Sequence, residues 1–137
     1  MAAWLVKTEP STYSYDDLVR DGTAEWDGVM NAQAQIHMRA MQVGDTCVVY
    51  HSMGQRAAVG LARVVAAPYP DPTDATGRRV WVDFQAVRPL ERPVTLKELK
   101  ADPGFATSPL VRQSRLSVLP LDDAQFATIE RLARESA

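Results

Sequence analysis

The sequence is poor in cysteine and has no long hydrophobic run. Cys47 is the single cysteine among 137 residues, so neither an intrachain disulfide nor a zinc cluster built on thiolates can form. No apolar stretch approaches the roughly 20 residues of a membrane-spanning helix. The start "MAAWLVKTEP" reaches a lysine and a glutamate before a signal-peptide core can develop. We therefore expect a protein of the reducing cytoplasm with no membrane segment.

An excess of basic charge is also absent. The net charge is −2, which argues against a protein that coats duplex nucleic acid through charge alone. The charges are unevenly distributed: residues 1–51 carry three basic and seven acidic side chains, residues 52–121 carry ten and six, and the rest carry two and four. The division indicates a basic middle segment between acidic ends, with an ordinary solvated surface of mixed charge as the alternative.

Signatures of enzymes and of metal or nucleotide sites are missing too. His37 and His51 are not part of an HExxH motif or another metal-ligand spacing, and no Walker A or GxGxxG motif occurs. Cys47 lies in the apolar run "TCVVY", which is typical of a buried, unreactive thiol. We expect no catalytic residue, no metal and no cofactor.

What the sequence does contain is a series of short strands and short helices. Strands are predicted over Trp4–Lys7, Thr46–Ser52, Ala58–Ala66 and Val80–Val87, with a fifth around Leu116–Leu119. Helix starts are predicted where a capping residue is followed three positions later by an acid or amide: Ser14 with Asp17, Thr95 with Glu98, and Asp122 with Gln125. The pattern predicts an α+β fold around a small, mostly antiparallel β-barrel with short peripheral helices, in a single domain of residues 1–137.

Two local features add detail to this fold. Gly60 interrupts a predicted strand, which indicates a bulge or a close approach of another group to the backbone. The segment of residues 68–79, "PYPDPTDATGRR", contains three prolines and a glycine and therefore predicts a surface connection between two strands.

Polar side chains cluster at the end of the first predicted strand, in "WLVKTEP". Pro10 ends this strand, and strand alternation places Lys7 and Glu9 on one side and Thr8 on the other. Such a cluster can line a pocket. A surface ion pair or a solvated strand end is the alternative.

The stretch "EWDGVMNAQAQ" places an aromatic ring and an amide on either side of a turn. Trp26 offers a flat apolar surface and Asn31 offers donors and acceptors, the groups needed to stack on a base and to read its edge. The alternatives are structural. Asn31 is a good N-cap for a helix over residues 32–42, and Trp26 can pack in the core against Ile36 and Ala40.

Seven ordered blocks make the chain similar to a known family. The blocks are "WLVKTEPSTYSYDDL", "EWDGVMNAQAQ", "MQVGDTCVVYHS", "VGLARVV", "YPDPT", "WVDFQAV" and "LVRQSRLSV". They resemble the EVE domain, a member of the PUA-like superfamily that also includes the YTH, ASCH and SRA modules. The resemblance implies a small β-barrel with a concave pocket on one side. It also implies a binding module for a modified base in DNA or RNA, single-stranded or flipped, or for a free modified nucleoside.

The resemblance also implies which residues bind the ligand. The family's pocket edge matches Lys7, Thr8, Glu9 and Pro10, and its Trp turn matches Trp26 and Asn31. Its strand end matches His51 and Ser52, and its Arg-Gln-Ser segment matches Arg112, Gln113 and Ser114. This chain departs from the pattern at Met30 and Gln35, where the family usually has basic residues.

Two missing positive charges imply few contacts with phosphates. We expect Arg112 and Arg115, with Arg78 and Arg79, to supply those that exist, so that single strands or nucleosides bind more readily than a perfect duplex. Two or three phosphate contacts predict a log–log salt slope of about 2–3. We expect the protein to act as a monomer.

Two other functions compete with this one. An ASCH-like amidohydrolase acting on acylated nucleosides would use Lys7, Thr8 and Glu9 as activator, nucleophile and proton carrier, which requires a lysine with a depressed pKa and a carboxylate near the nucleophile. A protein-interaction module would use the C-terminal helix, whose apolar stripe is Phe126, Ile129, Leu132 and Ala133.

Overall fold

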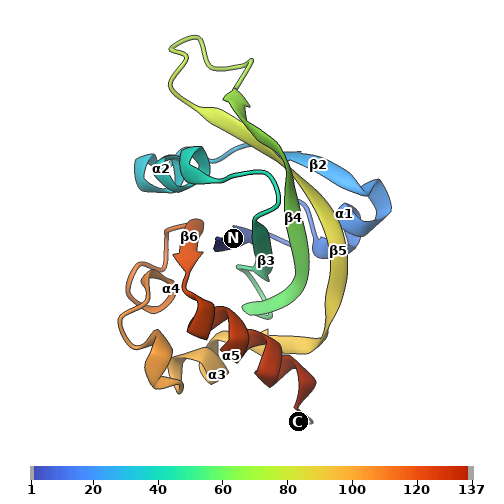
Figure 1. The fold of residues 1–137 in the computed structure, drawn as a ribbon, viewed down its shortest axis with the longest axis vertical. Coiled ribbons are helices and arrows are strands. Elements are labelled where there is room, and N and C mark those ends of the chain that lie inside the picture. Colours follow the sequence, from blue (N-terminus) through green and yellow to red (C-terminus); the bar gives the residue numbers. More distant parts are fainter. Residues whose placement is uncertain (1, 136–137) are drawn as a thin grey trace.

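A curved sheet of six strands forms the centre of the computed structural model, which describes residues 2–135. The strands are β1 (Ala3–Thr8), β2 (Thr23–Trp26), β3 (Thr46–His51), β4 (Ala57–Pro70), β5 (Val80–Thr95) and β6 (Val118–Leu121). They lie in the order β2-β5-β4-β3-β1-β6, and all neighbours are antiparallel except β1 and β3 (Figure 1). Among the residues described, no ladder joins β2 to β6, so the sheet curls into an open barrel. The expected α+β class with mostly antiparallel pairing is confirmed.

Short helices surround the sheet and begin where their capping residues predict. They are α1 (Tyr15–Asp21), α2 (Ala32–Ala40), α3 (Leu96–Lys100), α4 (Pro109–Arg112), α5 (Asp123–Arg134) and the 3₁₀ helix η1 (Pro103–Phe105). The capping boxes of Ser14, Thr95 and Asp122 are all formed, because each side chain satisfies an amide that the helix leaves unpaired. None of the helices within residues 2–135 is long and apolar enough to cross a membrane.

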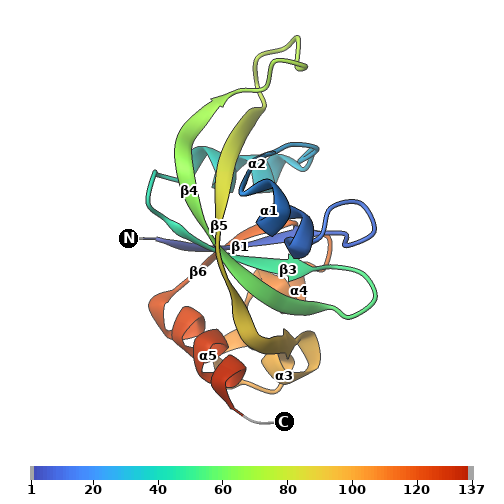
Figure 2. The ribbon, with the colours of Figure 1, turned by 90° about the vertical axis from the view of Figure 1, so that its right-hand side faces the viewer.

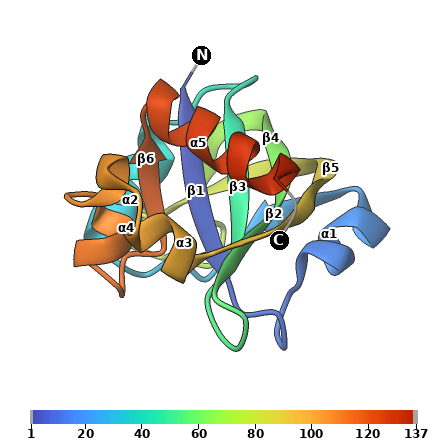
Figure 3. The same ribbon diagram turned by 90° about the horizontal axis from the view of Figure 1, so that it is seen from below.

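The core lies between the concave face of the sheet and these helices. Phe84, Leu5, Val48 and Val49 are fully buried on the strands, while α5 packs on β5 and β6 through Ile129 and contributes it to the same core. Figure 3 shows α5, in red, crossing the end of the barrel opposite the long β4–β5 hairpin of Figure 1. The stripe expected to be a protein-binding surface is thus partly occupied within the chain.

Several strands and helices differ from those predicted from the sequence. β5 continues from Val80 to Thr95, far beyond the expected end at Val87, and passes through Pro89 and Pro93. Its pairing with β4 shifts register several times, and such irregularities accommodate a proline that lacks a ladder donor. The fifth strand lies at Val118–Leu121, two residues later than expected. β2, α4 and η1 were not expected, because each is only three or four residues long.

Gly60 provides the close approach that its position in a strand predicted. A Cβ atom at this position would overlap the ring of Tyr15. The Tyr15 ring is buried on β4, and its hydroxyl donates a hydrogen bond of 2.7 Å to the carbonyl of Leu61. The missing side chain of Gly60 therefore allows α1 to dock on the sheet, and the register of both ladders shifts beside it.

Gly60→Ala should lower the free energy of unfolding by about 1–3 kcal/mol, the usual cost of forcing an extra methyl group into a packed site. Urea denaturation measures this directly. In a Tyr15→Leu background the ring is gone, so the same substitution should cost less. An unchanged cost in that background would mean that the clash with Tyr15 is not the cause.

Candidate functional site

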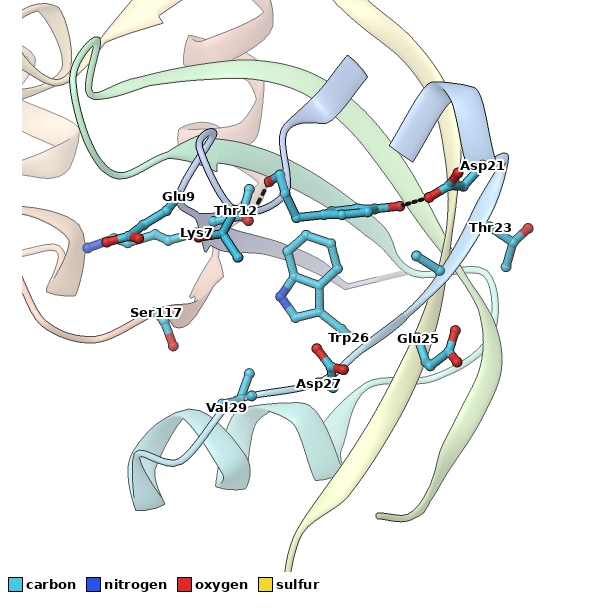
Figure 4. Close-up of a pocket in the computed structure, with 14 residues that line it drawn as sticks. Lys7, Glu9, Thr12, Asp21, Thr23, Glu25, Trp26, Asp27, Val29 and Ser117 are labelled. Carbon is cyan, nitrogen blue, oxygen red and sulfur yellow. Dashed lines mark hydrogen bonds between the residues drawn. The ribbon is translucent and has the colours of Figure 1, made fainter. Parts of the chain in front are cut away.

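A pocket opens beside the end of β1, where the chain turns into α1 and faces β2 (Figure 4). It has a volume of about 670 Å³, well within the range of small-molecule sites. Its lining residues come from four segments that converge here: Lys7, Thr8 and Glu9; Thr12 and Tyr13; Asp21 and Thr23 to Val29; and Ser117. The polar cluster of β1 and the Trp26 turn, separate in the sequence, thus share one pocket.

Trp26 forms the floor of the pocket and is 7% exposed. Its ring packs at 5.1 Å from Phe84 and meets Tyr13 edge-on at 6.2 Å with an interplanar angle of 83°. Ile36 is exposed, so the core packing expected for Trp26 involves Phe84 on β5 instead. In Figure 4 the indole nitrogen faces the open centre of the pocket. It has no acceptor among residues 2–135, and it is not one of the buried side-chain atoms that lack a partner, so this N–H is accessible to a ligand.

Tyr13 supplies a second aromatic wall that the sequence did not reveal. Its hydroxyl donates to Asp21 at 2.8 Å, and burial together with this carboxylate raises the pKa of Tyr13 to about 12. The ring is thereby held neutral and fixed in orientation over Trp26. The only sequence signal was its place three residues after Pro10, in a turn.

The polar residues of β1 are positioned by contacts of different kinds. The Lys7 ammonium donates to the carbonyl of Ser114 at 3.1 Å and lies 5.8 Å from the centre of the Tyr50 ring, and burial lowers its pKa. The Thr8 hydroxyl donates to the carbonyl of Tyr13 at 2.6 Å. Thr8 therefore fixes the turn that carries Tyr13.

Negative charge predominates in the pocket. Glu9, Asp21, Glu25 and Asp27 line it against the single ammonium of Lys7. Asp21 is engaged by Tyr13 and Arg20, while the other three carboxylates accept no hydrogen bond from residues 2–135. Figure 4 shows Asp27 beside the Trp26 ring. A ligand that presents hydrogen-bond donors matches this surface, and a phosphate does not.

Several residues expected at the site lie outside the pocket lining. Asn31 caps α2, its side-chain oxygen accepting from the amide of Ala34 at 2.9 Å, which is the structural alternative considered above. His51 Nε2 accepts from the amide of Tyr15 at 3.1 Å. Both side chains are thus engaged by the starts of helices. Pro10 and Ser52 lie next to lining residues, the amide of Ser52 donating to the carbonyl of Thr8 at 3.0 Å.

The Arg-Gln-Ser segment also lies beside the pocket instead of lining it. Arg112 ends α4 and donates to the carbonyl of Ala106 at 3.3 Å. Gln113 is the C-cap of the same helix, and Ser114 contributes the carbonyl that holds Lys7. The segment therefore positions a pocket residue through its backbone.

Residues suited to metal or thiol chemistry do not form a second centre. Within residues 2–135 no group of three His, Cys, Asp or Glu side chains could hold a metal ion. Cys47 is fully buried, and burial raises the pKa of its thiol, which makes it unreactive.

Comparison with known proteins gives one consistent result. The family model described as the EVE domain matches residues 2–132. Thymocyte nuclear protein 1 of Mus musculus is 34% identical, with 90% of this chain and 70% of the relative covered.

Solved structures agree with the sequence match. A protein of Rhodopseudomonas palustris is 42% identical, with a TM-score of 0.92 and coverage of 99% of this chain and 97% of that one. The human THYN1 protein in complex with 5-methylcytosine-containing DNA is 28% identical, with a TM-score of 0.92 and complete coverage of both chains. The expected PUA-like fold is confirmed by these similarities.

Thr8→Val should remove about 1 kcal/mol or more from the free energy of unfolding, because it leaves the carbonyl of Tyr13 without its donor while keeping the shape of the side chain. Thr12→Val, at an exposed position of the same pocket, is the matched control and should be close to neutral. Urea denaturation compares the two. Equal losses would show that the hydrogen bond from Thr8 does not stabilise the turn.

Proposed function

The chain belongs to the EVE domain family, and from this premise we propose that it binds a modified nucleobase carrying an exocyclic amino group, of which 5-methylcytosine is the leading example. The observation that carries the proposal is the acidic pocket around a tryptophan N–H that has no acceptor among residues 2–135. The complex of a related EVE protein with 5-methylcytosine-containing DNA supports it.

The aromatic residues suit a planar ligand. Trp26 and Tyr13 present two ring systems at nearly a right angle, so a base can lie against one ring while its edge meets the other. The indole N–H offers a donor to a ring nitrogen or carbonyl of the base. Val29 and Ala24 in the lining provide apolar contact for a methyl group.

The acidic residues determine which edge of a base is accepted. Carboxylates accept hydrogen bonds from the N4 amino group of cytosine. Asp27 lines the pocket next to Trp26 (Figure 4), and its carboxylate accepts no hydrogen bond from residues 2–135. Thymine carries the same 5-methyl group with a carbonyl in place of the amino group, and two acceptors facing each other repel. The pocket therefore discriminates by hydrogen-bond polarity, with Asp27 as the reading residue.

A base reaches this pocket only when it is unstacked. Extracting a base from a duplex costs a few kcal/mol, so single-stranded nucleic acid or a free nucleoside binds with the smaller penalty. Glu9 and Glu25 at the pocket add repulsion against phosphates close to the read base. The protein acts as a reader of the base itself.

The same geometry meets only part of what the hydrolase alternative requires. A nucleophilic Thr8 needs a base to accept its proton, but its hydroxyl donates to a backbone carbonyl. The lowered pKa of Lys7 meets one requirement of that chemistry, and the ammonium is held by Ser114. We therefore retain Lys7, Glu9 and Thr8 as pocket residues with no catalytic role.

5-Methyl-2′-deoxycytidine should bind more tightly than thymidine by about 1–3 kcal/mol, the usual value of a specific base contact. Isothermal titration of both nucleosides measures this difference. Asp27→Asn should shrink it, because an amide can donate to the thymidine carbonyl. Glu25→Gln, farther from Trp26 in Figure 4, removes the same charge and should preserve it. Equal affinities in the unmodified protein would overturn the proposed reading of the amino group.

Trp26→Phe should weaken 5-methyl-2′-deoxycytidine binding by about 1 kcal/mol through loss of the indole donor, while the aromatic packing on Phe84 is kept. Trp26→Ala is less suitable, because truncating a buried aromatic ring costs about 3–5 kcal/mol of stability. Titration of folded protein, checked by circular dichroism, gives the result. Unchanged affinity would exclude the indole N–H from recognition.

A further inference from the structure

A second hollow of about 500 Å³ lies where the turn between β3 and β4 meets α3. Three cationic side chains line it, Arg56, Lys97 and Lys100, and the remaining lining residues carry no acid. All three are exposed. This composition is the reverse of that of the base pocket.

The three cations are available to a ligand. In residues 2–135 none of them lies within 4.0 Å of a carboxylate, and the neighbouring acid of α3, Glu98, is held by Arg92 at 2.7 Å. Lys97 and Lys100 are three residues apart and so lie on the same side of α3. Arg56 has a left-handed backbone, φ 48°, and its carbonyl accepts from the amide of Leu96 at 2.9 Å. The turn and the helix are therefore joined into one surface.

The hollow and the base pocket lie at the same end of the sheet. One register row runs Thr8, His51, Ala57, Thr95 across β1, β3, β4 and β5; Thr8 lines the pocket and Thr95 lines the hollow. Three interstrand steps of about 4.8 Å separate them by about 14 Å. Figures 2 and 3 show the β3–β4 turn and the loop after β1 projecting on the same side.

Tyr50 connects the two sites at closer range. Lys7 of the base pocket lies over its ring. Burial raises the pKa of Tyr50, and the positive charge of Arg56 acts in the opposite direction. Lys7 and Tyr50 therefore lie on the paired strands β1 and β3, between the base pocket and the β3–β4 turn that carries Arg56.

We infer that this basic hollow binds backbone phosphates of the nucleic-acid strand whose modified base occupies the pocket; the inference rests on the proposed function. Guanidinium and ammonium groups are the usual phosphate partners. A separation of about 14 Å spans a few nucleotides of a single strand, because an unstacked backbone extends farther per nucleotide than the ~3.4 Å rise of duplex DNA. The phosphates bound here therefore flank the read base at a distance and avoid the carboxylates around it.

The cations expected from the sequence to meet phosphates are less suitable. Arg79 pairs with Asp71 at 3.6 Å and Asp74 at 4.0 Å, and Arg112 donates to a backbone carbonyl. Arg78 lies in the β4–β5 connection, at the other end of the ladder that begins with Ala57 and Thr95. Arg115 is exposed and stays a predicted phosphate contact, but neither it nor the other three arginines line the hollow, which groups three cations.

The test compares two triple variants of the full chain with the same change in charge. Arg56→Gln/Lys97→Gln/Lys100→Gln removes the hollow, and Arg39→Gln/Arg63→Gln/Arg78→Gln removes three exposed cations elsewhere. The probes are a nine-nucleotide DNA single strand with a central 5-methylcytosine and the free nucleoside 5-methyl-2′-deoxycytidine. Binding of the strand is measured at several salt concentrations.

The hollow variant should bind the strand about tenfold more weakly, and its log–log salt slope should fall by about 2, the value for three phosphates on a single strand. The control should keep the slope, and both variants should bind the nucleoside as the unmodified protein does. Arg56→Lys/Lys97→Arg/Lys100→Arg should restore the slope, which excludes a folding defect. An unchanged slope in the hollow variant, or an equal fall in both triples, overturns the inference. A different result would contradict the proposed function of the base pocket and leave the hollow intact. In that case the unmodified protein would not bind the nucleoside, while the salt slope of strand binding would still depend on the hollow.

Discussion

The fastening of β1 at both ends is the constraint on which the site depends. At its start, the buried Asp45 carboxylate accepts from the indole of Trp4 at 3.0 Å and from the amide of Ala2 at 3.3 Å. At its end, Thr8 accepts a hydrogen bond from the amide of Ser52 at its carbonyl and donates one from its hydroxyl to the carbonyl of Tyr13. Because β1 lies between β3 and β6, neither end can move without disturbing two ladders. Lys7 and the residues after it are therefore held rigidly at the wall of the pocket, a prerequisite for directed recognition.

The distribution of charge is compatible with the proposed binding of nucleic acid by a chain of net charge −2. The acidic first third of the sequence supplies the carboxylates of the base pocket, and the basic middle supplies the hollow beside it. The fold brings these segments to one end of the sheet through the pairing of Thr8, His51, Ala57 and Thr95. A carboxylate surface that favours an amino edge would repel the backbone of the same nucleotide. Recognition of the base and attachment of the strand therefore need separate surfaces, which a summed charge cannot reveal.

Features that depend on residues close together in the chain could be predicted from the sequence, and features that depend on distant residues could not. Thr95 and the other capping residues predict their helix starts correctly, because the two residues of a capping box lie within four positions of each other. The shared pocket of Lys7 and Trp26 followed from the family resemblance. Tyr13 had only its place in a turn as a sequence signal, and its position as a wall depends on hydrogen bonds with Thr8 and Asp21. The role that we propose for Arg56 likewise depends on α3, which lies far along the chain and is joined to it by a backbone hydrogen bond. The cytoplasmic location and the monomeric state stay predictions.

The two departures from the family pattern have different physical meanings. Gln35 is buried, and its amide donates to the carbonyls of Val29 and Val80 at 2.9 and 3.3 Å while accepting from the amide of Val80 at 2.9 Å. It therefore braces the loop that carries Val29 into the pocket, and its polar atoms face backbone groups instead of solvent. Met30, in contrast, is 64% exposed, so a basic residue there would reach solvent beside the pocket. The chain thus carries no positive charge at position 30 and has a structural brace at position 35. If a strand is bound as we propose, the cations that attach it must lie outside this loop, as those of the basic hollow do.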